Sequence, residues 1–161
     1  MKNKKILTEL KEHIPFTVAA TTVAVILTTF LLIKQNLMEY ATSWFYIFHP
    51  LHIFFSAIVS TAIFYKYRNN IFLALSTGVI ISILIGSISD VILPYLGISL
   101  FNIPISFHLP TIEKPLLIFS IAIFGSITGV VARRTKFPHF IHVLVSVFAS
   151  LLYIFAYSAN F

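Results

Sequence analysis

Five long apolar runs decide what this sequence can fold into. They cover residues 14–33, 44–65, 71–96, 115–132 and 138–157. An apolar helix needs about 20 residues to cross a hydrocarbon layer about 30 Å thick, and none of the runs alternates like a membrane strand. Charged residues make up only 10% of the chain, against about 25% in a soluble domain. We therefore expect an all-α integral membrane protein, a single domain over residues 1–161 with five transmembrane helices.

The basic residues between these runs predict the orientation of the chain. In a five-helix serpentine, nine of the eleven Lys and Arg residues fall on one side: Lys2, Lys4, Lys5, Lys11, Lys66, Arg68, Arg133, Arg134 and Lys136. Basic loops stay in the cytoplasm, so we expect a plasma-membrane protein with its N-terminus inside and its C-terminus outside. The net charge of +6 is then a topology signal, and no nucleic-acid partner is expected. The expected partner is the lipid bilayer, and a homo-oligomer is compatible with such a chain.

A polar pattern occurs twice and predicts an internal repeat. The pattern H-x2-H-x3-S-x3-S comprises His49, His52, Ser56 and Ser60 in one copy, and His139, His142, Ser146 and Ser150 in the other. On a helix the four positions of each copy fall within an arc of about 80°. A weaker match, a His followed two residues later by Pro, precedes each copy at His13 and His108.

An odd number of crossings separates the two copies, so they must run in opposite directions through the membrane. We expect an inverted-topology repeat, with helices 1–2 and 4–5 arranged around a central helix 3. Many secondary transporters have this organisation.

Ionisable residues at membrane depth predict where a site would lie. In this topology the outer side receives His49, His52, Asp90, His108 and Glu113, and the inner side receives Glu12, His13, His139 and His142. Imidazole and carboxylate groups together suit Zn²⁺, Fe²⁺, Mn²⁺, Co²⁺ or Ni²⁺, whereas the absence of cysteine excludes thiolate ligands. We expect one metal cluster near each membrane face, about 15 to 20 Å apart. A salt bridge between Asp90 and Lys114 is the structural alternative for that carboxylate.

The leading hypothesis is a small transporter or channel for a divalent metal cation. Hydroxyl groups would line its path, at Ser56, Ser60, Ser146, Ser150, Thr17 and Thr21. A membrane-bound redox or hydrolytic enzyme with His-ligated haem or metal is the alternative, and a non-catalytic membrane subunit is a third. No nucleotide-binding or hydrolase motif occurs in the sequence, so no catalytic residue is assigned.

Overall fold

The computed structural model describes residues 2–33, 39–132 and 136–158, without the side chains of residues 2–10, 12, 13, 32 and 136. Its elements are α1 (Lys2–Ile33), α2 (Ala41–Tyr67), α3 (Ile71–Ser87), the π-helical turn η2 (Ile88–Ile92), α4 (Leu93–Leu100), α5 (Pro110–Glu113), α6 (Pro115–Val131) and α7 (Lys136–Tyr157). Within these residues the only β pairing is an isolated bridge between Ile105 and Ser158. The described part of the chain is therefore all-helical, as expected.

Among the described residues, four helical segments are long and apolar enough to cross a membrane. They are Ile14–Leu31 of α1, Ala41–Tyr67, Ile71–Leu100 through α3, η2 and α4, and Phe137–Tyr157 of α7, while α6 is a shorter apolar helix. Large apolar side chains such as Phe72, Leu100 and Leu116 lie on the outside of the bundle, where lipid can solvate them. Length and composition together are those of a multi-pass membrane protein.

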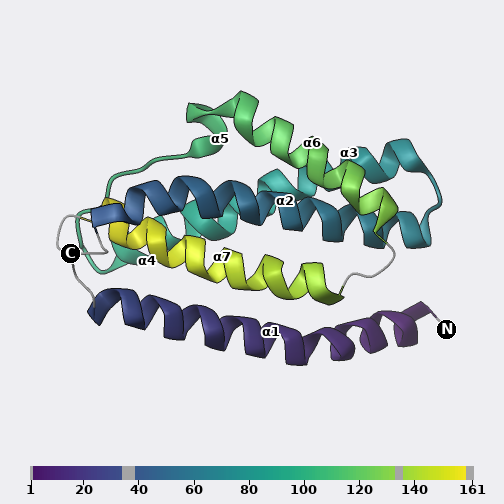
Figure 1. Cartoon of the computed structure of the whole chain (residues 1–161), viewed down its shortest axis with the longest axis horizontal. Coiled ribbons are helices and arrows are strands. Elements are labelled where there is room, and N and C mark those ends of the chain that lie inside the picture. The colour runs from purple at the N-terminus through teal and green to yellow at the C-terminus, as the bar shows by residue number, and fades with distance from the viewer. Residues whose placement is uncertain (1, 34–38, 133–135, 159–161) are drawn as a thin grey trace.

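Helix α2 occupies the centre of the bundle. It packs against α3, α6 and α7, while α1 lies along the far side of α7 (Figure 1). The buried share is 56% in α2, against 33% in the segment Ile71–Leu100. The expectation of a central third helix is therefore wrong. The side of α2 that faces its neighbours carries small residues such as Ala57 and Ala62, which allow three helices to approach it.

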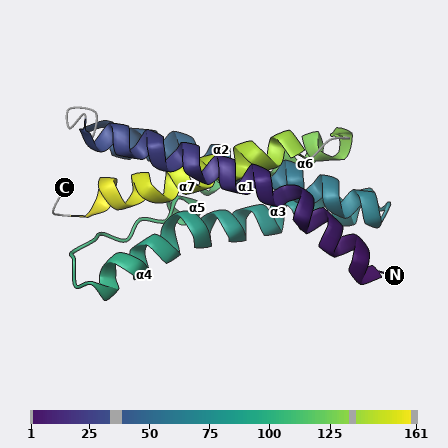
Figure 2. The same cartoon turned by 90° about the horizontal axis from the view of Figure 1, so that it is seen from below.

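Successive long helices run in opposite directions, which gives the bundle two distinct ends. Helices α1, α3 and α7 begin at the end where α2 ends, as Figures 1 and 2 show. We call this the basic end, because Lys66 and Arg68 lie there. The opposite end carries α5 and its Glu113, and we call it the Glu113 end.

Close backbone contact fixes α6 on α2. A Cβ atom added to Gly125 would lie 2.5 Å from the carbonyl oxygen of Phe54, and one added to Gly129 would lie 2.6 Å from that of Ile58. Only glycine allows backbones to approach this closely. The two glycines are one helical turn apart, so they hold one face of α6 against α2.

Candidate functional site

Among the described side chains, the fully buried histidines and the fully buried carboxylate form one hydrogen-bonded group. Oδ2 of Asp90 lies 2.9 Å from Nδ1 of His49 and 2.7 Å from Nδ1 of His52, which is also 2.9 Å from Oδ1. All three side chains have no solvent exposure. An ionised carboxylate only accepts hydrogen bonds, so each Nδ1 is the protonated nitrogen of its ring. We call these three residues the Asp90 site.

A π-helical turn places Asp90 between α2 and α7. The turn η2 interrupts the otherwise continuous course of α3 into α4, and it packs against α7. A π-helical turn inserts an extra residue into a helix and changes where the following side chains point, and such turns are frequent at functional sites. The sequence signal of this turn is weak: an Asp inside an apolar run, with a Pro four residues later.

Three serines complete the surroundings of the carboxylate. The hydroxyl of Ser89 donates to Oδ1 of Asp90 over 2.7 Å, and that of Ser146 reaches the same oxygen over 3.3 Å. Ser150 Oγ lies 3.0 Å from the carbonyl oxygen of Ser89. Hydrogen bonds to an ionised acceptor are stronger than those between neutral groups, so the network favours the charged carboxylate. Sequence reasoning found Ser146 and Ser150 but missed Ser89, whose only signal is that it precedes Asp90.

Several imidazole nitrogens of this region are buried without a hydrogen-bond partner among the described residues. They are Nε2 of His49, Nε2 of His52 and both ring nitrogens of His142. Burying an unpaired polar group costs about 1 to 3 kcal/mol. In the neutral form of each ring, a proton on Nδ1 leaves Nε2 with a lone pair that points away from the carboxylate. This is how a carboxylate orients a histidine that binds a metal through its other nitrogen.

The imidazoles continue from the Asp90 site toward the basic end. The rings of His52 and His142 stack with their centroids 4.7 Å apart and an interplanar angle of 24°. The rings of His142 and His139 are 5.9 Å apart, edge to face. Nε2 of His139 lies 3.4 Å from Oγ1 of Thr17 on α1. We call His49, His52, His142 and His139 the histidine chain.

The expected division into two clusters on opposite faces is therefore wrong for these residues. Helix α2 begins at Ala41, eight residues before His49, and continues through Pro50. At 1.5 Å per residue this places His49 about 12 Å inside the helix end. The second copy also lies inside its helix, because α7 begins at Lys136. The two histidine pairs meet in the interior, where α2 packs against α7.

The other predicted path residues are distributed along the same helices. Ser56 is buried on α2, while Ser60 and the α1 residue Thr21 are half-buried. Glu12 and His13 belong to α1, but their side chains lie outside the described part of the structure. The salt bridge between Asp90 and Lys114 is not formed. Asp90 pairs with histidines instead, and the Lys114 ammonium lies 3.9 Å from the centroid of the Tyr46 ring.

His108 and Glu113 form a separate group at the Glu113 end. Nδ1 of His108 lies 3.0 Å from Oε1 of Glu113, and the Tyr46 hydroxyl donates to Oε2 over 2.6 Å. Burial raises the pKa of the Glu113 carboxyl, but the hydrogen bonds from Tyr46 and His108 outweigh burial, so the pKa lies below its usual value. The His108 side chain is 42% exposed, so this group faces the surroundings of the bundle. We call Tyr46, His108 and Glu113 the Glu113 cluster.

The Asp90 site is not a closed metal cage. Among the described side chains, no group of three or more His, Cys, Asp or Glu is placed to hold a metal ion. At Asp90, the carboxylate oxygens accept hydrogen bonds from Nδ1 of His49 and of His52, so these nitrogens and oxygens do not face a common ion. Asp90 therefore orients two imidazoles and adds a negative charge, and the remaining nitrogens are the available ligands.

Comparisons with known proteins assign nothing further to this chain. No protein-family model, no curated protein and no solved structure matches it. The geometry of the Asp90 site and of the histidine chain therefore carries the functional argument.

Proposed function

We propose that the chain is a small transporter or channel of the cell membrane that carries a divalent transition-metal cation through the Asp90 site. One observation carries the proposal. One buried carboxylate holds Nδ1 of both His49 and His52, and leaves Nε2 of both rings unpaired. Imidazole nitrogen oriented in this way is a typical ligand for Zn²⁺ and its neighbours in the first transition row. Ionisable groups inside a membrane bundle are expensive and usually mark an ion pathway.

Transport suits this site better than catalysis, because polar groups extend from it along the bundle. The histidine chain continues toward the basic end, and the Glu113 cluster lies at the other end of the same helix α2. The cation is then cargo, bound by Nε2 of His49 and His52 next to the negative charge of Asp90. The ring of His142 stacks on that of His52 and is the next imidazole toward the basic end.

Helix contacts support the five-span inverted repeat that this proposal includes, with the shorter helix α6 as the fourth crossing along the chain. A two-fold axis in the membrane plane would exchange α1 with α6 and α2 with α7. It would also exchange the contact between α2 and α6 with that between α7 and α1, and both contacts are present, whereas the packing of α3 on α6 has no comparable counterpart between α3 and α1. His52 and His142 hold the same position in the two copies, and their rings stack on each other. Equivalent residues meet in this way close to a two-fold axis.

The haem alternative gains no comparable support. The rings of His52 and His142 are stacked 4.7 Å apart, so a porphyrin has no room between them and these two residues cannot be its two axial ligands.

The basic residues at one end of the bundle favour a cytoplasmic N-terminus, and this orientation is part of the same proposal.

Flux of metal ions into liposomes tests the proposal. Purified protein is reconstituted around a metal-sensitive dye, and the uptake of Zn²⁺, Mn²⁺, Fe²⁺, Co²⁺ and Ni²⁺ is followed for wild type and variants. We expect Asp90→Asn to lower the uptake of the transported ion at least tenfold, because it removes the negative charge and replaces one of the two oxygens that accept hydrogen bonds from the imidazoles with an amino group. Glu39→Gln makes the same change at an exposed carboxylate and should leave uptake within twofold of wild type.

His49→Gln and His52→Gln separate loss of ligands from loss of fold. Both keep a polar side chain next to Asp90 but remove Nε2 as a ligand. Gel filtration and circular dichroism report whether each variant is folded. Folded variants of both histidines with wild-type uptake would refute the proposal, as would a wild type that passes none of the five ions.

A further inference from the structure

Helix α1 is held to the bundle by a weaker interface than the other long helices. It packs mainly against α7, and 22% of its apolar segment is buried, against 28% in α7, 33% in Ile71–Leu100 and 56% in α2. Its sequence contains no glycine, whereas α6 is fitted closely onto α2 by Gly125 and Gly129. Helices α1 and α6, which the two-fold axis of the proposed repeat would exchange, are therefore packed on the bundle in very different ways.

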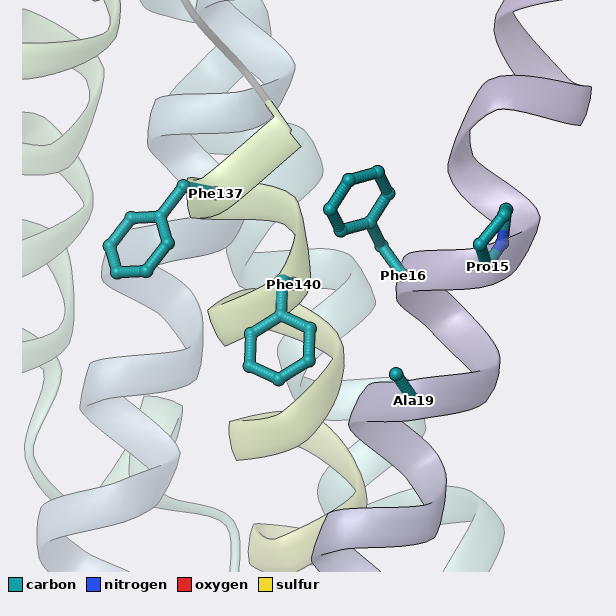
Figure 3. A pocket seen from close by; sticks show the side chains of 5 residues that line it. All are labelled: Pro15, Phe16, Ala19, Phe137 and Phe140. Atoms are coloured by element: carbon teal, nitrogen blue, oxygen red, sulfur yellow. The ribbon is translucent and has the colours of Figure 1, made fainter.

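An apolar groove separates α1 from α7 at the basic end. Its lining residues are Pro15, Phe16 and Ala19 on α1 and Phe137 and Phe140 on α7, and its volume is about 530 Å³ (Figure 3). In Figure 3 the ring of Phe16 projects from α1 toward α7, and the ring of Phe140 lies over α7. The two helices are therefore incompletely packed at this end.

The groove borders the end of the histidine chain. Thr17 follows Phe16, and His139 lies between Phe137 and Phe140 in the sequence. The contact between Thr17 and His139 is long, at 3.4 Å, and both ring nitrogens of the neighbouring His142 are buried without a partner among the described residues. The incompletely packed part of the α1–α7 interface thus lies beside imidazoles that can accept a cation.

We infer that His142 and His139 form a second cation position between the Asp90 site and the basic end, and that α1 is its movable cover. The inference rests on the proposed function. A cation leaves Nε2 of His52 for His142, whose ring is stacked on that of His52, and then passes His139. Movement of α1 away from α7 opens this position to the basic end, and its return closes it. The tight contact of α6 with α2 provides the fixed frame against which α1 moves.

Cross-linking α1 to α7 tests the cover, and the chain suits the experiment because it contains no cysteine. Phe16→Cys is combined with Phe140→Cys, and the pair is joined by a bifunctional methanethiosulfonate reagent that a reducing agent cleaves. The control pair joins α2 to α6 through Phe54→Cys and Phe124→Cys, whose native rings are stacked 5.8 Å apart. We expect the α1–α7 cross-link to lower metal uptake at least tenfold, with recovery on reduction. The α2–α6 cross-link should change uptake less than twofold.

A binding measurement adds a second readout. His142→Gln should bind the transported metal at equilibrium within about threefold of wild type, because the Asp90 site is intact, while its uptake into liposomes falls at least tenfold. Loss of equilibrium binding in this variant would show that His142 belongs to the Asp90 site, and it would overturn the inference. Unchanged uptake after the α1–α7 cross-link, or equal inhibition by both cross-links, would also overturn it.

The two proposals fail in different ways. If wild type carries metal but the α1–α7 cross-link has no effect, only the cover is wrong. If wild type neither binds nor carries metal, both the proposed function and the second cation position are refuted.

Discussion

At the scale of single residues, the main question is why a membrane bundle keeps a carboxylate and several imidazoles in its interior. Removing one partner of a buried ionic pair typically costs about 3 to 5 kcal/mol, whereas an apolar replacement of the whole group is often neutral. The group of His49, His52 and Asp90 is therefore poorly explained as a stabilising device. Its unpaired Nε2 atoms suit a role in binding.

The serines of α7 give a first prediction at this scale. The Ser150 hydroxyl lies 2.8 Å from the carbonyl oxygen of Ser146 in its own helix and 3.0 Å from that of Ser89 in η2, whereas Ser146 reaches Asp90 over a long 3.3 Å. We expect Ser150→Ala to lower the free energy of unfolding by about 1 kcal/mol, and Ser146→Ala to lower it by less. Chemical unfolding in detergent measures both. Thr29→Ala, which removes an exposed hydroxyl bonded within its own helix, is the control, and an equal effect of all three changes would contradict the assignment.

The Glu113 cluster gives a second prediction, which concerns pH. The pKa of Glu113 in the folded protein lies below its usual value of 4.5, so its contacts contribute their full stability above that value. This contribution is lost as pH falls through the lower, folded pKa. We expect the melting temperature of wild type to fall between about pH 5 and pH 3, and a smaller fall in Glu113→Gln. Parallel curves for the two proteins would show that the carboxyl is not coupled to folding.

At the scale of helices, the packing of α6 on α2 gives a third prediction. A Cβ atom at Gly129 would lie 2.6 Å from the Ile58 carbonyl oxygen, whereas one at Gly97 would meet nothing within 4 Å. We expect Gly129→Ala to destabilise the protein by about 1 to 3 kcal/mol. Gly97→Ala, the same change in α4, should be neutral or stabilising by up to about 1 kcal/mol. Thermal unfolding in one detergent compares the pair, and a neutral Gly129→Ala would mean that α6 can move away from α2.

The same scale explains how far the sequence predicts this structure. Apolar runs predict the helices because burying a backbone in lipid requires every residue of a span to be helical. The repeated histidine pattern also identifies the residues of the histidine chain. Their meeting could not be predicted, because it depends on α2 continuing through Pro50 and on the packing of α2 against α7. The turn η2 follows from tertiary packing and has no periodic sequence signal.

At the scale of the whole molecule, the two copies of the repeated pattern have different surroundings. Asp90 belongs to η2 and bonds the histidines of the first copy, while the serines of the second copy support the carboxylate and its turn. The first helix of each repeat also has different surroundings. Gly125 and Gly129 hold α6 closely against α2, whereas an incompletely packed groove borders α1. An inverted repeat in a transporter exchanges such unequal halves between two states. Under the proposed function, the structure represents the state in which Asp90 is bonded to the histidines of the copy on α2.

The fourth prediction concerns the direction in which the bundle lies in the membrane. Asn69 lies at the basic end and Ile112 at the Glu113 end, and both are exposed. The chain has no cysteine, so Asn69→Cys and Ile112→Cys each introduce a single thiol. Because basic loops stay in the cytoplasm, we expect a membrane-impermeant maleimide to label Ile112→Cys on intact cells, and Asn69→Cys only after the membrane is opened. The reverse pattern would invert the topology and make the α1 cover an extracellular gate. Labelling of both positions on intact cells would rule out an odd number of crossings between them, and with it the continuous span from Ile71 to Leu100.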